Sequence, residues 1–485
     1  MTGPAGPGLW ADGSRAGPDP ALDRLNRSLP FDWRLWPYEL AVDRAWVAEL
    51  AALGLVDAEE ARRLDAGLEA VRARLAAWHP GDEPDEDIHS LIERWLEEEV
   101  GPLASRVRLG RSRNDVVATD ARMWARDACA AMDARLERLA TALVDAAARA
   151  GDAPFPVYSH LQRAQPTRAA AWLLSHVWPL LRNRDRLADA ARRFDRLPLG
   201  TAAGSGSALG VDRDRLARAL GFDAPDPSAL DAVGARDWAA EVVWCWTMTA
   251  VDLTRLAEDL VLFASSEFGI VRLGDAWTTG SSLMPQKRNP DGAELARAGG
   301  GALIGLLTGL LATLKGLPSG YAKDLQEDKR ALFEAEARLA PVLDVLAGTV
   351  RGLEIVPAAA ARALDPGVFA SDLAEALAVR GLPFREAHLV TARLVRRAAE
   401  LGVPLPDLLA GEAAREAAAA GAGEHGAWDD GAWEKLRDEV FDVEAALERR
   451  RAAGGSARAA IAAQLRAARE ALGGSAAPPR QAEET

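Results

Sequence analysis

Apolar residues recur every three or four positions along most of the chain, the spacing that places them on one face of an α-helix. No stretch alternates valine, isoleucine or threonine with polar residues for the length of a strand, so a large β-sheet is not expected. Pro179 predicts a kink in one helix, because proline lacks a backbone N–H. The pattern predicts helices at 41–53, 57–77, 88–100, 118–150, 167–194, 235–265, 291–314 and 325–353.

Several helices between 118 and 353 exceed about 25 residues, which is typical of bundles whose helices pack side by side. Their apolar residues cover more than one face, so we expect neighbouring subunits to cover what one chain leaves exposed. Shorter helices and an Ala/Gly-rich turn at 417–423 follow Asp365-Pro366. The predicted fold is all-α, with an N-terminal helical domain, a central long-helix bundle and a small C-terminal helical domain at 1–110, 111–364 and 365–485.

The chain has 485 residues, of which 49% are hydrophobic, enough for a large core. Its 58 basic and 72 acidic residues give a net charge of −14, which argues against a nucleic-acid surface. Cys129 and Cys245 lie in apolar helical stretches, so a reducing compartment is expected and a disulfide framework is not. The longest uncharged run, 298–314, contains five glycines and is short for a bilayer span. Residues 1–20 show no charged-then-apolar signal, so we expect a cytoplasmic protein without a membrane partner.

The segment 278–291 combines a glycine, two serines, two prolines and several polar side chains. Pro290 can open a helix, so Lys287, Arg288 and Asn289 lie just before a predicted helix N-terminus. Cations and a helix N-terminus both favour a bound carboxylate or phosphate. On composition alone, the same segment could be a plain surface loop.

Arg111, Ser112, Arg113 and Asn114 precede the helix predicted at 118–150. Two guanidinium groups suit a dicarboxylate ligand, because each can pair bidentately with a carboxylate. The alternative interpretation is a solvated, charged helix start.

His160 lies among serine, glutamine and arginine just before a predicted helix, where proton transfer suits it better than core packing. Tyr321, Gln326 and Lys329 converge if a helical turn begins near residue 324. The alternative for this last segment is an ordinary polar helix start.

His89 and Glu93 lie four residues apart and offer half a metal site, but a hydrogen-bonded helix histidine is the favoured interpretation. We therefore expect no metal and no organic cofactor. The loop 197–210 is no dinucleotide fingerprint, because Leu209 replaces the third glycine and no strand precedes the loop.

Together these segments resemble the fumarase/aspartase superfamily, whose members eliminate fumarate from a succinyl-bearing substrate. The run from Gly280 to Asp291 carries the signature G-S-S-x-M-P-x-K-x-N-P in the form found in the argininosuccinate lyase family. The likeness spans nearly the whole chain. Further shared runs lie at 26–28, 31–32, 210–213, 257–260, 316–319, 383–388 and 454–458.

The resemblance implies a role for each matching residue. Ser281 is the base that removes a Cβ proton, and His160, held by Glu294, serves the leaving nitrogen. Lys287 and Asn289 stabilise the doubly charged carboxylate of the carbanion. The predicted substrate-binding positions are Ser28, Arg113, Asn114, Ser159, Asn289, Tyr321, Gln326 and Lys329. The resemblance also implies a homotetramer with a shared core of about 20 helices, whose active sites draw residues from different subunits.

Elementary chemistry supports these roles. A hydrogen next to a carboxylate is weakly acidic, so elimination needs a base and a means of bearing the negative charge. Lys287 and the following helix N-terminus supply that electrostatic stabilisation and help Ser281 lose its proton. A histidine side chain can carry a proton near neutral pH, which suits His160 to serve a leaving amine.

The sequence departs from the family pattern near the predicted site. Arg108-Leu109 replace the usual His-Thr, Val116 replaces a glutamine, and the segments 11–14 and 201–208 lack common elements. The elimination chemistry is therefore better supported than the substrate.

We predict an enzyme that reversibly eliminates fumarate from argininosuccinate and releases arginine. One alternative is a related lyase acting on another N-substituted aspartate. Another is a non-catalytic structural protein on the same scaffold, as some lens crystallins are. The intact set of Ser281, His160, Lys287 and Glu294 counts against that last alternative.

Overall fold

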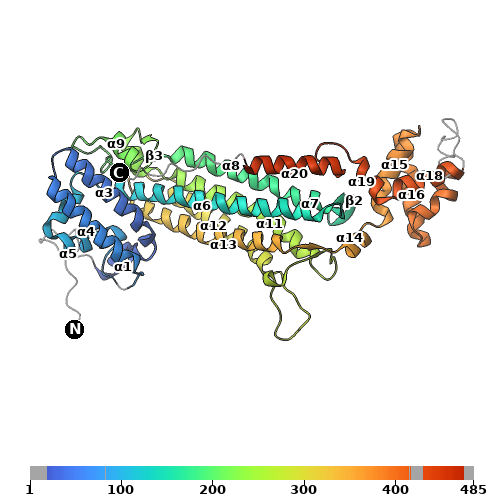
Figure 1. The fold of residues 1–485 in the computed structure, drawn as a ribbon, viewed down its shortest axis with the longest axis horizontal. Coiled ribbons are helices and arrows are strands. Elements are labelled where there is room, and N and C mark those ends of the chain that lie inside the picture. Colours follow the sequence, from blue (N-terminus) through green and yellow to red (C-terminus); the bar gives the residue numbers. More distant parts are fainter. Residues whose placement is uncertain (1–18, 82, 414, 417–429, 474–485) are drawn as a thin grey trace.

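The computed structural model describes residues 19–81, 83–413, 415–416 and 430–473. The predicted turn at 417–423 and the segment 11–14 lie outside them. The chain is elongated and helical, with a group of helices at each end of a bundle of long helices (Figure 1). The prediction of an all-α fold is confirmed.

The N-terminal helices pack around Trp46 and Trp95, whose side chains are almost fully buried. Asp57 caps α4 and Glu60 completes a capping box, so this helix begins where the sequence predicts. α3 begins earlier than predicted, at Trp36, because Pro37 suits the first helical turn. These elements are α1 (Pro20–Asn26), α2 (Leu29–Asp32), η1 (Trp33–Leu35), α3 (Trp36–Ala52), α4 (Ala58–Ala76), α5 (Ile88–Val100) and η2 (Gly101–Arg108).

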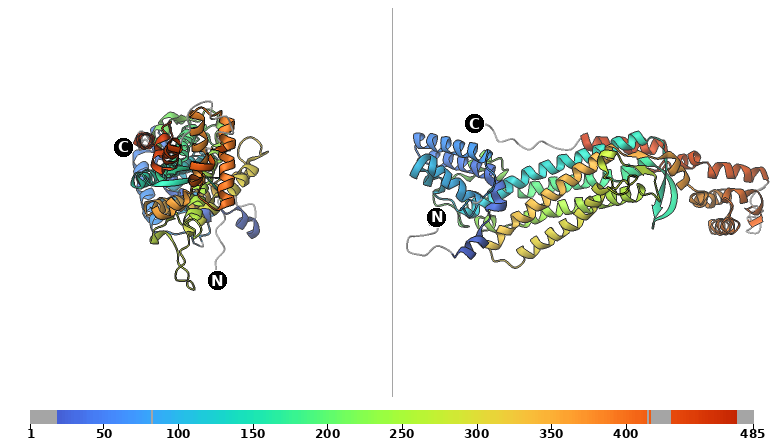
Figure 2. Two further views of the ribbon diagram at one scale, coloured as in Figure 1. Left: turned by 90° about the vertical axis from the view of Figure 1, so that its right-hand side faces the viewer. Right: turned by 90° about the horizontal axis from the view of Figure 1, so that it is seen from below.

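Five helices form the bundle and lie side by side (Figures 1 and 2). They are α6 (Arg113–Ala150), α8 (Val177–Phe194), α11 (Asp237–Phe263), α12 (Asp291–Leu314) and α13 (Asp328–Arg351). α6 begins at Arg113 because Ser112 caps it and Asp115 closes a capping box.

Residues 154–168 form an antiparallel hairpin of β1 (Pro154–Ser159) and β2 (Gln162–Arg168). The prediction that His160 directly precedes a helix is therefore wrong, because His160 lies in the turn of this hairpin. The chain there pairs its backbone groups across the hairpin instead of along a helix.

The helix predicted at 167–194 is two helices, α7 (Ala169–Ser175) and α8, which are separated at His176. The interruption at His176 lies three residues before Pro179, close to the predicted kink. Pro179 lies in the first turn of α8, where a backbone N–H has no helical partner in any case.

Short elements connect the long helices. They are β3 (Arg196–Leu197), α9 (Arg213–Ala219), β4 (Ala224–Pro225), α10 (Ala229–Gly234), β5 (Val271–Arg272), η3 (Asp275–Trp277), η4 (Lys323–Glu327) and β6 (Glu354–Ile355). β3 pairs with β4 in parallel, and β5 pairs with β6 antiparallel.

The C-terminal helices hold a second, smaller apolar core that extends from Leu364 to Ala446. The last helix leaves that group and lies along the bundle against α6, where Ile461 and Ala468 join the main core (Figure 1). These elements are α14 (Pro357–Ala363), η5 (Pro366–Phe369), α15 (Ala370–Val379), α16 (Phe384–Leu401), η6 (Leu405–Leu408), η7 (Leu409–Ala413), α18 (Asp430–Phe441), α19 (Val443–Arg449) and α20 (Arg458–Gly473).

α12 leaves most of its apolar surface uncovered. In the part of the chain that the structure describes, it is the one helix long and apolar enough to cross a membrane by length and composition alone, and 22% of its most apolar window is buried. The side chains of Leu295, Ile304 and Leu311 are 68%, 49% and 51% exposed. Exposed apolar surface of this kind is typical of interaction sites.

Gly348 of α13 packs against Trp277, which directly precedes the segment 278–291. A Cβ at Gly348 would lie 2.0 Å from Cζ2 of Trp277. We expect Gly348→Ala to displace the indole and lower the free energy of unfolding by about 1–3 kcal/mol, measured by urea denaturation. In a Trp277→Ala background the same change should be neutral or stabilising, since alanine is the better helix former. Equal destabilisation in both backgrounds would contradict this packing account.

Candidate active site

The predicted site residues lie in three separate groups within one chain. The N-terminal group consists of residues from the first domain and from the starts of α6 and α13. A hairpin group lies in the turn between β1 and β2, and a loop group lies between η3 and the first turn of α12 (Figure 1). The N-terminal group contains Ser28, Arg113, Asn114, Tyr321, Gln326 and Lys329. The hairpin group contains Ser159 and His160. The loop group contains Ser281, Lys287, Asn289 and Glu294.

Hydrogen bonds between distant segments hold the N-terminal group together. The backbone N–H of Ser28 donates to the carbonyl of Glu86 (2.8 Å), and its buried hydroxyl donates to Asp32 (2.5 Å). The amide of Gln326 donates to the carbonyl of Asn26 (3.1 Å). This bond ties the segment 321–329 to the N-terminal residues within one chain, and η4 begins at Lys323, close to the helical turn expected near residue 324.

A buried ion cluster of Arg236, Asp328 and Lys329 lies beneath these residues. The side chains of Arg236 and Asp328 are fully buried and paired, and Lys329 Nζ donates to Asp328 (2.8 Å). Burial opposes the charged form of Asp328, but Lys329 and Arg236 outweigh it and lower its pKa. Two cations beside one carboxylate leave a positive charge, which suits a ligand carboxylate.

Burial, reinforced by Asp328, raises the pKa of Tyr321 to about 12. Its hydroxyl therefore keeps its proton and remains a hydrogen-bond donor at neutral pH. The sequence interpretation missed Arg236. The sequence feature that could have pointed to Arg236 is its position at the N-terminus of α11, where the helix dipole disfavours positive charge.

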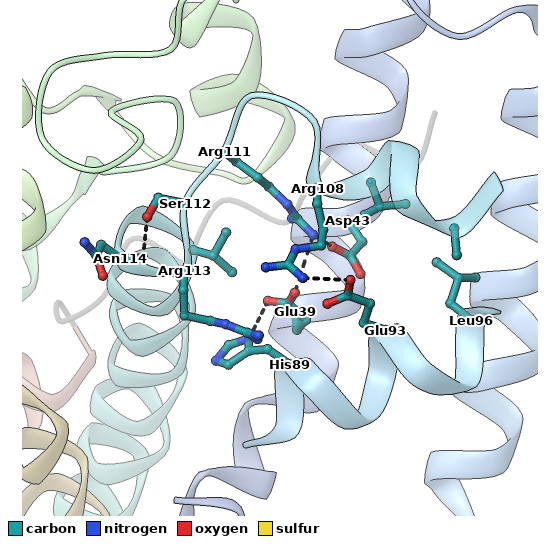
Figure 3. A pocket seen from close by; sticks show the side chains of 13 residues that line it. Glu39, Asp43, His89, Glu93, Leu96, Arg108, Arg111, Ser112, Arg113 and Asn114 are labelled. Atoms are coloured by element: carbon teal, nitrogen blue, oxygen red, sulfur yellow. Dashed lines mark hydrogen bonds and ion pairs between the residues drawn. The ribbon is translucent and has the colours of Figure 1, made fainter. Parts of the chain in front are cut away.

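The two arginines of the predicted clamp line one cavity, but each is already paired within the protein. Arg111 is buried against Asp43, and the guanidinium of Arg113 lies 3.2 Å from both Asp87 and the Ser90 hydroxyl. Figure 3 shows Arg111 directed at Asp43, with Asn114 apart from it on α6. Protein carboxylates thus pair with both guanidinium groups, and the dicarboxylate clamp stays a prediction.

The two substituted positions before this motif are tied to the N-terminal domain. Arg108 pairs with Glu93 (3.0 Å), and the carbonyl of Leu109 accepts from the indole of Trp46 (3.0 Å). Arg108 also lines a cavity of about 330 Å³ that extends to Asn114 (Figure 3). The positive charge of Arg108 is thus paired with the carboxylate of Glu93. His89, in turn, is hydrogen-bonded through Nδ1 to Glu39 (2.8 Å).

His160 and Leu161 form a two-residue turn in which both have positive φ, 55° and 57°. Ser159 pairs with Gln162 directly below the turn. Arg163 binds Asp365 (2.6 Å) and so fastens the hairpin to the start of η5. The hairpin therefore presents His160 to solvent at its tip.

Thr279 and Asn289 exchange backbone hydrogen bonds of 3.1 and 2.8 Å, which close the base of the exposed loop 280–288. The Ser281 hydroxyl oxygen accepts from the backbone N–H groups of Leu283 (3.2 Å) and Met284 (3.1 Å). Two such donors stabilise negative charge on a serine oxygen. The loop then enters α12 at Pro290, which places Lys287 close to the positive end of the helix dipole.

The long helices keep the N-terminal and hairpin groups apart. Asn114 lies in the first turn of α6, and His160 lies beyond its last residue, Ala150. A helix of 38 residues is about 57 Å long, too far for both residues to contact one small ligand. Within the described residues of one chain, no hydrogen bond joins His160 to Ser281 or to Glu294. Within one chain, the N-terminal and hairpin groups therefore do not meet at one small ligand.

Asp115 anchors the loop 200–208 beside Asn114. Its carboxylate accepts from the backbone N–H groups of Ser112 (3.0 Å), Gly200 (2.9 Å) and Ala202 (2.8 Å). Burial raises the pKa of Asp115 to about 6, although these three donors favour the charged form.

We expect Asp115→Asn to lower the free energy of unfolding by about 1–3 kcal/mol, because the new amide nitrogen faces an N–H that has lost its acceptor. Urea denaturation measures the stability, and hydrogen exchange at 200–208 measures the anchoring. Asp57→Asn is the matched control. One oxygen of Asp57 accepts hydrogen bonds from the backbone N–H groups of both Glu59 and Glu60. The amide oxygen of an asparagine can therefore cap α4 about as well. Equally small effects of both substitutions would contradict the anchoring role.

Comparison with known proteins places this geometry in a family. The family model described as "Lyase" matches residues 15–305, and the model described as "Argininosuccinate lyase C-terminal" matches residues 368–448. The argininosuccinate lyase of Roseiflexus castenholzii is 44% identical over 96% of this chain and 100% of its own length. That of Thermobifida fusca is 42% identical over 96% of this chain and 95% of its own length.

Solved structures share the fold. EDDS lyase in complex with formate superposes with a TM-score of 0.82 at 27% identity, over 92% of this chain and 87% of that one. Class II fumarase from Schistosoma mansoni, at 15% identity, shares the fold with a TM-score of 0.71 over 86% of this chain and 92% of that one. The chain belongs to the argininosuccinate lyase family.

Proposed function

We propose that the protein cleaves argininosuccinate into arginine and fumarate by β-elimination of a carbon–nitrogen bond. The observation that carries this proposal is the loop at the start of α12, where two backbone N–H groups point at the Ser281 oxygen. The assignment of argininosuccinate as the substrate rests on relatives with 42–48% identity that bear the name argininosuccinate lyase.

Ser281 acts as the base at Cβ of the succinyl group. The N–H groups of Leu283 and Met284 lower the cost of its alkoxide, and Lys287 adds positive charge. As the proton leaves, the adjacent carboxylate becomes doubly charged. Lys287, Asn289 and the N-terminus of α12 stabilise that charge.

His160 protonates the leaving nitrogen as the C–N bond breaks, and Glu294 orients its imidazole from another copy of the chain. The N-terminal group binds the rest of the substrate through Ser28, Arg113, Asn114, Tyr321, Gln326 and Lys329, with Ser159 added from the hairpin. The buried cation excess at Arg236 and Lys329 favours a substrate carboxylate there.

The active site is shared between subunits of a homotetramer. The exposed apolar face of α12 supports this assembly, because neighbouring copies would bury Leu295, Ile304 and Leu311. The separation of Asn114 from His160 supports it independently. The buried, reduced cysteines Cys129 and Cys245 are consistent with a cytoplasmic location.

A related lyase acting on another N-substituted aspartate is the second candidate. The similarity to EDDS lyase favours it, but at 26–27% identity this similarity is weaker than that to argininosuccinate lyases. Arg108, the substitution that suggested a changed amine side, is already paired with Glu93.

A substrate panel separates the two candidates. We expect the purified protein to release fumarate from argininosuccinate with kcat/KM of about 10⁴ M⁻¹s⁻¹ or more, and far more slowly from other N-succinyl amines. Ser281→Ala should abolish turnover while argininosuccinate still binds, because only transition-state stabilisation is lost. Faster release from another N-succinyl amine would favour the second candidate, and an active Ser281→Ala enzyme would remove this serine from the mechanism.

Mixing two inactive variants tests the shared site. His160→Asn and Ser281→Ala tetramers are dissociated, combined equally and reassociated. If the two residues come from different chains, about a quarter of the sites regain both wild-type residues, so activity returns to about a quarter of the wild-type level. Each variant reassociated alone is the control. Mixed tetramers, verified by mass, that remain inactive would contradict the shared site.

A further inference from the structure

Three helices bring Glu39, His89 and Asp120 together behind the N-terminal group. Glu39 comes from α3, His89 from α5 and Asp120 from α6, and their exposed fractions are 3%, 3% and 0%. His89 Nδ1 lies 2.8 Å from a Glu39 oxygen and 3.7 Å from an Asp120 oxygen. Figure 3 shows the Glu39–His89 pair at the edge of the cavity.

The carboxylate of Asp120 lacks a donor. Both of its oxygens are buried, and no described residue donates a hydrogen bond to either one. Its carboxyl group faces that of Glu39, and the two can hydrogen-bond to each other only if they share a proton. Both can be ionised in this buried place only if a cation lies between them.

The geometry suits a metal ion as that cation. The ligand atoms of Glu39, His89 and Asp120 all lie within 4.8 Å of one another. A tetrahedral Zn²⁺ with bonds of about 2.0–2.1 Å holds its ligands about 3.3 Å apart. The two measured separations, 2.8 and 3.7 Å, lie on either side of that value.

The surrounding charges are also compatible with a divalent ion. Arg111 pairs with Asp43, so these two are neutral together, and it lies 3.6 Å from the other Glu39 oxygen. Glu39 and Asp120 then carry two negative charges that one divalent cation neutralises. The cavity of about 330 Å³, lined by Glu39 and His89, gives access from solvent and room for a water as fourth ligand.

We propose that Glu39, His89 and Asp120 form a binding site for a divalent first-row cation, with Zn²⁺ as the best match to one imidazole and two carboxylates. The ion ties α3, α5 and α6 together behind Arg113 and serves a structural role. This site is independent of the elimination chemistry.

Zinc titration of the full-length tetramer after chelator treatment tests the site. Calorimetry should find one tight Zn²⁺ per chain, and zinc should raise the melting temperature. His89→Gln and Asp120→Asn should each weaken binding at least about tenfold and remove that thermal shift. His176→Gln is the matched control. His176 also pairs with a carboxylate, Asp259 (3.1 Å), but belongs to no three-ligand group among the described residues.

X-ray absorption at the zinc edge of the wild-type protein needs no variant, and it should show nitrogen and oxygen ligands without sulfur. If Asp120→Asn does not fold, Glu39→Gln replaces it. The absence of tight zinc binding by the wild type would overturn the proposal and leave a shared proton between the carboxylates. Binding that survives in His89→Gln and Asp120→Asn but is lost in His176→Gln would overturn it too, since it would place the ion at His176.

Discussion

The stiffness and length of the bundle helices determine which polar groups of one chain can lie close together. α6 alone is 38 residues, and a continuous helix of that length holds its ends about 57 Å apart. The chain places polar, reactive groups at such ends and in the loop before α12. Each group is well formed locally, but the N-terminal group and the hairpin group lie at opposite ends of α6.

The same helices explain the distribution of apolar surface. α11 and α13 cover one side of α12, whereas Leu295, Ile304 and Leu311 remain exposed. Association of copies, as in the homotetramer that we propose, accounts for both features. In that assembly the apolar face would supply the driving force, and symmetry would bring the groups together.

The sequence predicted the helices of the bundle well, because apolar periodicity is strong over long segments. It missed the β1–β2 hairpin, since His160-Leu161 replaces the glycine-containing pair that usually marks such a turn. The signature motif identified Ser281, Lys287 and Asn289, but their exposure on a projecting loop became evident only in three dimensions. Arg111 and Arg113 were expected to bind a ligand because guanidinium pairs well with carboxylate, and their protein partners Asp43 and Asp87 could not be foreseen because they are distant in sequence. The cluster of Glu39, His89 and Asp120 was hidden for the same reason: its members meet only once α3, α5 and α6 have packed.

The central claim is that one active site contains groups from different copies of the chain. A crystal or cryo-electron-microscopy structure of the assembled Ser281→Ala protein with argininosuccinate tests it most directly. The account predicts a single ligand contacted by Asn114, His160 and the loop 280–288 from three separate chains. A ligand whose contacts all come from one chain would contradict it.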